Sequence, residues 1–266
     1  SGLEGVTLQT PGGTGNSSVQ KIAAAFPTIT NAAELDSRCN ISSMKLQRDE
    51  RGAVTKEIYQ SNQRPCADGN GAYGRTFTHD AQGRITGVTY RDAQGAPKAN
   101  THGVAGFKVE RNDAKRETAI TYLNEEGRPQ INGSHWATLR ATWNDMGAPA
   151  RLGYFDESGQ PCHVPEKGFQ SVRMTYDAQC NCATYEYYAP DGSPCLNKSN
   201  VSKFSFEHDG LGRQTRETAY STDGKPCLAA DGVCSTVYKH DGNRIIQREF
   251  YGTDGKPCLN NEGCAA

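Results

Sequence analysis

The sequence predicts an all-β protein, a tandem array of about seven antiparallel β-hairpins with a period of about 32 residues. One observation is a phrase at residues 220–228 that recurs almost unchanged at 251–259 and, with more changes, at 188–196. The other is the proline of this phrase, which recurs at intervals of 32, 32, 32, 33, 32 and 31 residues. These anchor prolines are Pro65, Pro97, Pro129, Pro161, Pro194, Pro226 and Pro257. The regular spacing assigns residues 41–266 to the array.

Each repeat carries two turn signals. The first is Asp-x-x-Gly or a close variant, as at residues 80–83 and 209–212. Asp accepts a hydrogen bond from its own backbone two residues on, and Gly adopts a positive φ at little cost. The second is the Asp-Gly-x-Pro phrase itself, and Asp-Gly between alternating segments is a strong hairpin signal.

The segments between the turns alternate with a period of two. Residues 84–90 and 213–220 follow the first turn, and residues 75–79, 171–176 and 203–208 precede it. They are rich in Thr, Tyr, Phe and Val, which is typical of half-buried antiparallel strands. A single hairpin is marginal in water, but stacked hairpins bury their aromatic residues against one another. We therefore expect an elongated or curved meander, a solenoid-like sheet.

The turn sequences also resemble a known family of repeats. The pattern Tyr/His-Asp-x-x-Gly-Arg, at residues 79–84 and 208–213 with a partial copy at 176–179, resembles the YD repeats of Rhs-type bacterial surface and toxin-shell proteins. The longer phrase Tyr-x-x-Asp-Gly-x-Pro resembles tandem repeats of bacterial extracellular proteins. The resemblance covers the repeat region only. It implies a β-rich protein that is secreted, periplasmic or at the cell surface, and it supplies no catalytic residues.

Two segments precede the array. Residues 1–19 are rich in Gly, Ser and Thr and predict a flexible arm. Residues 20–40 predict a short helical cap, with Ser17 as N-cap and Pro27 ending the first helix. Such a cap would cover the open edge of the first repeat.

Composition excludes some classes of partner. The net charge is −1, so no basic field attracts nucleic acid or anionic lipid. No apolar run approaches the roughly 18 residues of a membrane span, so membrane insertion is not expected. No signal peptide is visible, and we interpret the chain as a mature or trimmed piece of an exported protein.

The chain has 10 cysteines, an even and high number. In thin repeats with little core, disulfides are the expected staples, and they imply an oxidising compartment. Five cysteines follow an anchor proline, and the ten are Cys39, Cys66, Cys162, Cys180, Cys182, Cys195, Cys227, Cys234, Cys258 and Cys264.

Spacing suggests three of the disulfide pairs. Cys227 with Cys234 and Cys258 with Cys264 look like equivalent loop closures, and Cys39 with Cys66 would join the cap to the first repeat. The sequence leaves open how the remaining four pair, namely Cys162, Cys180, Cys182 and Cys195.

Metal, cofactor and catalytic sites are not expected. Cys180 and Cys182 form a Cys-x-Cys pair, which is not the spacing of a structural zinc site. Three histidines precede an Asp at one repeat position, but Tyr176 and Trp143 occupy the same position elsewhere, which indicates a packing position. These histidines are His79, His208 and His240. No nucleophile–base set or paired carboxylates can be selected, so we do not expect an enzyme.

Aromatic residues recur just before the second turn. Where two are adjacent, as at Tyr187 and Tyr188, alternation sends them to opposite faces of the sheet. One face would form the core and the other an exposed aromatic ladder suited to sugar rings or protein contacts. The candidate binding residues are Tyr154, Tyr187, Tyr220 and Tyr251.

Two functions remain in competition at this stage. The favoured one is a secreted or cell-surface binding and adhesion module for a glycan or protein partner on a host or envelope surface. The alternative is a structural spacer or shell segment of a larger surface or toxin protein.

Overall fold

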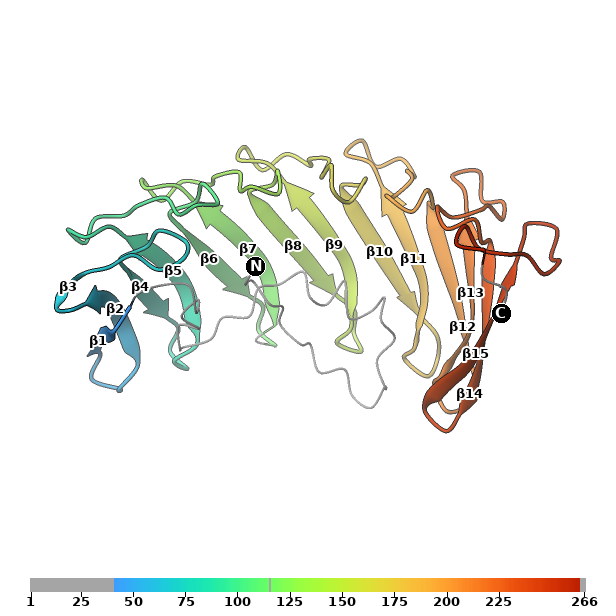
Figure 1. The fold of residues 1–266 in the computed structure, drawn as a ribbon, viewed down its shortest axis with the longest axis horizontal. Helices are drawn as coiled ribbons and strands as arrows, with labels where there is room; N and C mark the ends of the chain where they lie inside the picture. The colour runs from blue at the N-terminus through green and yellow to red at the C-terminus, as the bar shows by residue number, and fades with distance from the viewer. Residues whose placement is uncertain (1–40, 115, 264–266) are drawn as a thin grey trace. The chain divides into compact units, whose positions relative to one another are not determined.

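The computed structural model describes residues 41–114 and 116–263, in which every strand is antiparallel and no helix occurs. The all-β prediction is therefore confirmed, whereas the expected arm (1–19) and helical cap (20–40) lie outside the described residues. Within each compact unit, neighbouring strands in the sheet follow one another along the chain, except that β3 lies off this path and pairs with β2 (strands labelled in Figure 1). The strands are β1 (Ser43–Arg48), β2 (Val54–Ser61), β3 (Arg64–Pro65), β4 (Gly74–His79), β5 (Ile85–Arg91), β6 (Gly106–Arg111), β7 (Glu117–Leu123), β8 (Thr138–Trp143), β9 (Pro149–Phe155), β10 (Ser171–Tyr176), β11 (Cys182–Tyr188), β12 (Lys203–His208), β13 (Gln214–Tyr220), β14 (Ser235–Asp241) and β15 (Arg244–Tyr251).

The chain divides into two compact units. Within the described residues, unit 1 comprises residues 41–140 and 154–160, and unit 2 comprises residues 141–153 and 161–263.

The repeats are hairpins of a leading and a return strand, closed by a five-residue turn except between β14 and β15, where Asp241 pairs with Arg244 across a two-residue turn. In the hairpin of β12 and β13, the Asp209 Oδ1 atom accepts the backbone N–H groups of Leu211 and Arg213 at 2.9 and 3.0 Å. The Asp209 N–H donates to the Arg213 carbonyl, and Gly212 has a φ of 75°. The side chain of the first residue therefore substitutes for backbone partners that the turn lacks.

The post-proline loop contains a third turn that the sequence analysis missed. The Asn197 Oδ1 atom accepts the N–H groups of Ser199 and Val201 at 2.9 and 3.1 Å, as in the first turn. The fourth residue here is Asn200, whose φ is 60°, so the glycine that marks the other turns is absent. An Asx residue three positions before Gly, Asn or His is the signal that identifies these turns.

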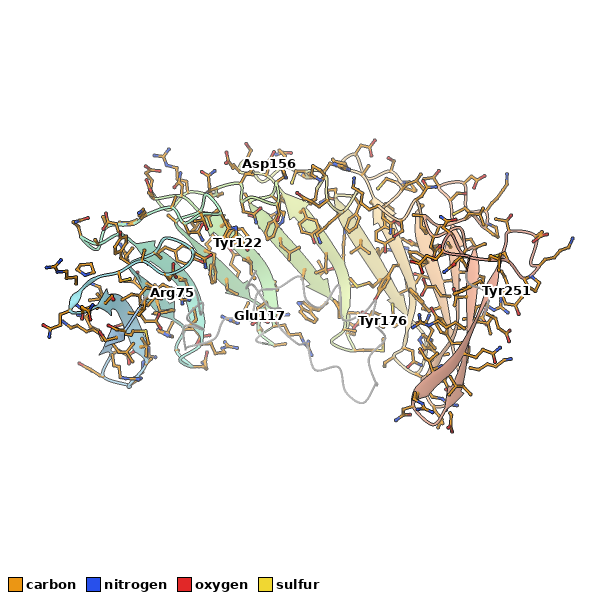
Figure 2. All side chains as sticks on the ribbon, viewed as in Figure 1. Arg75, Glu117, Tyr122, Asp156, Tyr176 and Tyr251 are labelled. Atoms are coloured by element: carbon orange, nitrogen blue, oxygen red, sulfur yellow. The ribbon has the colours of Figure 1, made fainter. Side chains whose placement is uncertain are left out.

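One face of each unit holds the core. In β11, Tyr185 and Tyr187 are 2% and 7% exposed and point to this core face, whereas Glu186 and Tyr188 point to the opposite, outer face. Within a repeat, one core-face residue accepts at its carbonyl a hydrogen bond from the N–H group of the residue after the anchor proline. We call the set of these residues the core row. It is occupied by Tyr59, Tyr90 and Tyr122 in unit 1 and by Tyr187, Ala219 and Phe250 in unit 2 (Tyr122 is labelled in Figure 2).

Each post-proline loop leaves and rejoins the ladder at one point. In unit 2, the Cys227 N–H donates to the Ala219 carbonyl at 3.0 Å, and the Ala219 N–H donates to the Cys234 carbonyl at 2.8 Å. In an antiparallel hydrogen-bonded pair a single residue makes both bonds. Here Cys227 makes one of the two bonds to Ala219 and Cys234 makes the other, so the two cysteines face each other where the loop leaves and rejoins the sheet. We call this point the neck of the loop.

No disulfide joins the described cysteines, and all of the predicted pairings stay predictions. Cys39 and Cys264, which the other two predicted pairs require, lie outside the described residues. Cys180 and Cys182 point to different environments, because Cys180 is exposed in a turn and Cys182 is buried. Burial raises the pKa of the Cys182 thiol to about 12.

We expect a Cys227–Cys234 disulfide in protein that has been equilibrated with an oxidised glutathione buffer. The neck geometry holds the two side chains together, so closing the loop costs little additional chain entropy. The tryptic peptide 217–239 contains both cysteines, and mass spectrometry without reduction should show it lighter by two hydrogens. Alkylation of both thiols in the oxidised sample would refute this pairing, and Cys227→Ser provides the unpaired reference.

We also expect the turn aspartates to make stability depend on pH in acid. Slight burial raises the pKa of Asp80, but hydrogen bonds from Arg84 and Gln82 outweigh it and lower the pKa to about 2. The folded value lies below the ordinary value of 3.8, so this stabilisation is present above pH 3.8 and is lost as the pH falls toward 2.

The matched variant is Asp80→Asn, because Asn112 and Asn144 hold equivalent turns without a titrating group. Thermal midpoints at about pH 5 and about pH 2 should differ less in Asp80→Asn than in the wild type. If the thermal midpoint falls equally between the two pH values in the wild type and in Asp80→Asn, Asp80 does not cause the acid sensitivity.

Candidate functional site on the outer face of unit 2

Three tyrosines occupy equivalent positions on the outer face of unit 2. Tyr188, Tyr220 and Tyr251 each form an antiparallel bridge with the anchor proline that follows, and each is half-buried. Tyr251 is labelled at the end of β15 in Figure 2. Neighbouring members of this tyrosine row are two strands apart, a distance of roughly 10 Å.

The four candidate binding residues do not share a face. Tyr220 and Tyr251 belong to the tyrosine row, but Tyr154 and Tyr187 are 3% and 7% exposed. Register explains the difference, because the outer-face residue lies six positions before the anchor proline. In the pair of residues 154 and 155 this position is Phe155, and in the pair of residues 187 and 188 it is Tyr188. Phe155 and Tyr188 therefore face outward. The binding role of the four residues remains untested.

Tyr188 belongs to a cluster of four polar side chains. The Arg151 Nη2 atom donates to the Ser171 Oγ atom at 2.9 Å, and the Tyr188 hydroxyl donates to the Glu186 Oε2 atom at 2.8 Å. Ser171 and Tyr188 are paired across β10 and β11. Arg151 is therefore held next to the tyrosine by a hydroxyl rather than by a carboxylate.

The same cluster recurs around Tyr251. The Arg216 Nη1 atom donates to the Ser235 Oγ atom at 3.2 Å, and the Tyr251 hydroxyl donates to the Glu249 Oε2 atom at 2.9 Å. Arg216 also lies over the Tyr251 ring, with its Cζ atom 5.9 Å from the ring centroid. We name these two sets the Arg–Ser–Tyr–Glu clusters, and they lie two repeats apart.

The repeat between the clusters departs from this pattern. Thr184 stands in place of the arginine and Lys203 in place of the serine. The Lys203 ammonium lies over the Tyr220 ring at 5.9 Å from its centroid and contacts Glu186 at 3.4 Å. Lys203 therefore connects Tyr220 with the cluster around Tyr188.

The outer face of unit 2 is moderately basic. On the strand segments before each bulge, it carries five cations and three carboxylates, although the whole chain has a net charge of −1. Arg151 and Arg173 are directly opposite each other on β9 and β10. Like charges in that arrangement repel, so an anion placed between them would be stabilised. The cations are Arg151, Arg173, Lys203, Arg216 and Lys239, and the carboxylates are Glu186, Glu207 and Glu249.

The two carboxylates within the clusters are stabilised in their charged form. The Tyr188 hydroxyl, Arg173 and Lys203 outweigh slight burial and lower the pKa of Glu186. The Lys239 ammonium and the Tyr251 hydroxyl lower the pKa of Glu249. Both clusters therefore present fixed charges at neutral pH.

The sequence analysis missed the clusters because their members are far apart in the chain. Arg151 and Arg216 each lie ten positions before an anchor proline, and the matching tyrosine belongs to the next repeat. An alignment of the repeats on the prolines, restricted to outer-face positions, would have shown both.

The other residues considered at the sequence level form no catalytic set. The His208 Nδ1 atom lies 4.0 Å from the Asp177 Oδ2 atom, and the His240 Nε2 atom lies 2.7 Å from the Gln214 carbonyl oxygen. Burial lowers the pKa of His208, although Asp177 and Asp209 oppose the shift. Within residues 41–114 and 116–263, no three His, Cys, Asp or Glu side chains lie close enough to hold a metal ion. No helix in this part of the chain has the length and apolarity needed to cross a membrane.

No protein-family model and no curated protein matches the sequence. Solved structures similar to it include TcdB2-TccC3 and a Tc holotoxin pore. The TcdB2-TccC3 structure is 11% identical with a TM-score of 0.40, and the match covers 83% of this chain and 12% of that chain. The Photorhabdus luminescens Tc holotoxin pore is 14% identical with a TM-score of 0.36, over 79% of this chain and 11% of that one. The chain thus spans a small part of these proteins, and at this level of similarity the comparison does not extend to function.

The two faces predict losses of stability of different size for neighbouring tyrosines. Tyr187→Ala removes a buried ring and should lower the free energy of unfolding by about 3–5 kcal/mol. Tyr188→Ala removes a half-buried ring from the outer face and should cost about 1 kcal/mol. Urea denaturation of both variants measures the difference, and equal losses would contradict the assignment of the two faces.

Proposed function

We propose that the chain is a binding module and that the outer face of unit 2 binds an extended acidic glycan. The observation that carries the proposal is the recurrence of the Arg–Ser–Tyr–Glu cluster. Tyr and Arg combine a large contact area with directional hydrogen bonds, which makes them the residues most enriched at binding hot spots.

The excess of cations favours an anionic partner. Arg151 is bonded to a serine hydroxyl, so its remaining N–H groups can bind a carboxylate or sulfate group. Lys203 and Arg173 share Glu186, and this leaves both cations only partly neutralised. Tyrosine, serine and threonine hydroxyls between the cations supply hydrogen bonds for the hydroxyl groups of a sugar.

Periodicity favours a glycan over a protein, the two partner classes that the sequence left open. Sites of one kind recur along the strand order at multiples of roughly 10 Å. A polymer with a repeating unit can occupy several such sites at once, and linked contacts strengthen one another. The surface of a folded protein has no matching repeat, so a glycan fits this face better than a protein does. The proposal includes a secreted or cell-surface location, which the ten cysteines and the resemblance to Rhs-type repeats favour.

The test is binding of the full chain to immobilised heparin, polygalacturonate and neutral dextran. We expect retention on an acidic polymer, none on dextran, and a decrease with salt, because the contact is largely electrostatic. The double variant Arg151→Ala with Arg216→Ala should weaken binding about tenfold or more.

The matched control removes two charges elsewhere in unit 2. Lys225→Ala with Lys256→Ala changes side chains that are each 81% exposed, and it should leave binding nearly unchanged. If both double variants lose the same binding affinity, the effect depends only on net charge and not on the clusters. Absence of binding to all three polymers would favour the spacer or shell function instead.

A further inference from the structure

Unit 2 has a cavity where the core row lacks a large side chain. Tyr187 and Phe250 occupy this row in the repeats on either side, but the repeat between them has Ala219. A cavity of about 290 Å³ lies over Ala219. Its strand residues are Phe204, Glu217, Ala219 and Thr236, and the loop supplies Asp231 and Val233.

The partner of the missing ring is absent too. The Asn197 side chain lies beside the Tyr187 hydroxyl and lowers its pKa, although burial dominates and raises the pKa to about 12. Asn132 stands in the same relation to Tyr122 in unit 1. The residue equivalent to these asparagines, identified by its turn hydrogen bonds, is Ala229. The repeat therefore lacks both the phenol ring and the amide beside it.

Polar groups replace apolar ones around this cavity. Glu217 occupies the position of Tyr185 in the preceding repeat, and Thr236 occupies that of Phe204. The Glu217 Oε2 atom accepts a hydrogen bond from the Gln214 Nε2 atom at 3.2 Å. Burial and the nearby Asp231 raise the pKa of Glu217, although hydrogen bonds from Gln214 and Tyr238 and the charge of Arg248 oppose the shift. The cavity is therefore lined by polar and apolar groups in similar measure, with two carboxyl groups beside the Phe204 and Val233 side chains.

We propose that this cavity is a binding site for a phenol, a single aromatic ring that carries one hydrogen-bond donor. The ring packs against Phe204 and Val233 in the space that a core-row tyrosine fills in neighbouring repeats. The hydroxyl donates to the carboxyl group of Glu217 or Asp231. Apolar cavities of about 150 Å³ already hold a benzene molecule, so one substituted ring fits here.

The probe is para-cresol, which has the atoms of a tyrosine side chain. Titration of the full chain, followed by amide chemical shifts, should move the signals of Phe204 and Thr236 with a dissociation constant on the order of 1 mM. Toluene, which lacks the donor, should bind roughly tenfold more weakly because a buried acceptor is then left unpaired.

The decisive variant is Ala219→Tyr, which introduces the residue that Tyr187 supplies in the preceding repeat and should abolish binding. Ala219→Leu fills part of the same space with a smaller side chain. It should also abolish binding, and it replaces Ala219→Tyr in the test if that variant does not fold. Glu217→Gln should reduce the preference for para-cresol over toluene. Unchanged binding of para-cresol in the two Ala219 variants would overturn the proposal. So would the absence of amide chemical-shift changes in the wild type up to the solubility limit of para-cresol.

A second probe, N-acetyltyrosine amide, distinguishes the source of the ring. Binding of this compound with an affinity close to that of para-cresol assigns the site to a tyrosine side chain of a peptide. Binding of para-cresol alone assigns it to a small phenol. Because the cavity lies on the core face, either result is independent of glycan binding by the outer face.

Discussion

Three residue pairs join one hairpin to the next, and the organisation of unit 2 depends on their register. Between β11 and β12 the pairs are Thr184 with Ser205, Tyr185 with Phe204, and Glu186 with Lys203, and β13 and β14 are joined in the same way. A slip of one residue would send every side chain to the other face. The core row, the tyrosine row and the cavity over Ala219 therefore exist only while these short ladders hold.

Local chemistry explains what could be predicted from the sequence. The period, the hairpins and the first turn follow from residues close together in the chain, such as Asp209 and Gly212, and the structure confirms them. The third turn was missed because its left-handed residue changes between repeats, being Gly103, His135 and Asn200 in three of them. Alternation also predicts that Tyr187 and Tyr188 point to opposite faces, and the structure confirms it. Only burial shows which of them faces outward, because Tyr187 is 7% exposed and lies in the core.

The candidate sites could not be predicted for a related reason. Each Arg–Ser–Tyr–Glu cluster takes residues from three strands and two repeats, so no short motif contains it. The cavity is marked by what one repeat lacks, the ring at Ala219 and the amide at Ala229, and composition does not record such a loss. Differences between repeats thus carry more information about function than the features that repeats share.

Because each post-proline loop closes at its neck, the length of the loop does not alter the pairing of the strands. Ser202 and Gln170 re-enter the ladder in the same way, each donating its N–H to the last residue of a return strand, although the span from Cys195 to Ser202 is one residue shorter than that from Cys162 to Gln170. An insertion beyond the neck changes no strand pair, and the entropy of closing a longer loop grows slowly with length. The loop residues themselves set the limit, because Val201 is fully buried and the Lys198 N–H donates to the Lys167 carbonyl of the neighbouring loop. Foreign peptides are therefore accepted only at loop positions outside these contacts.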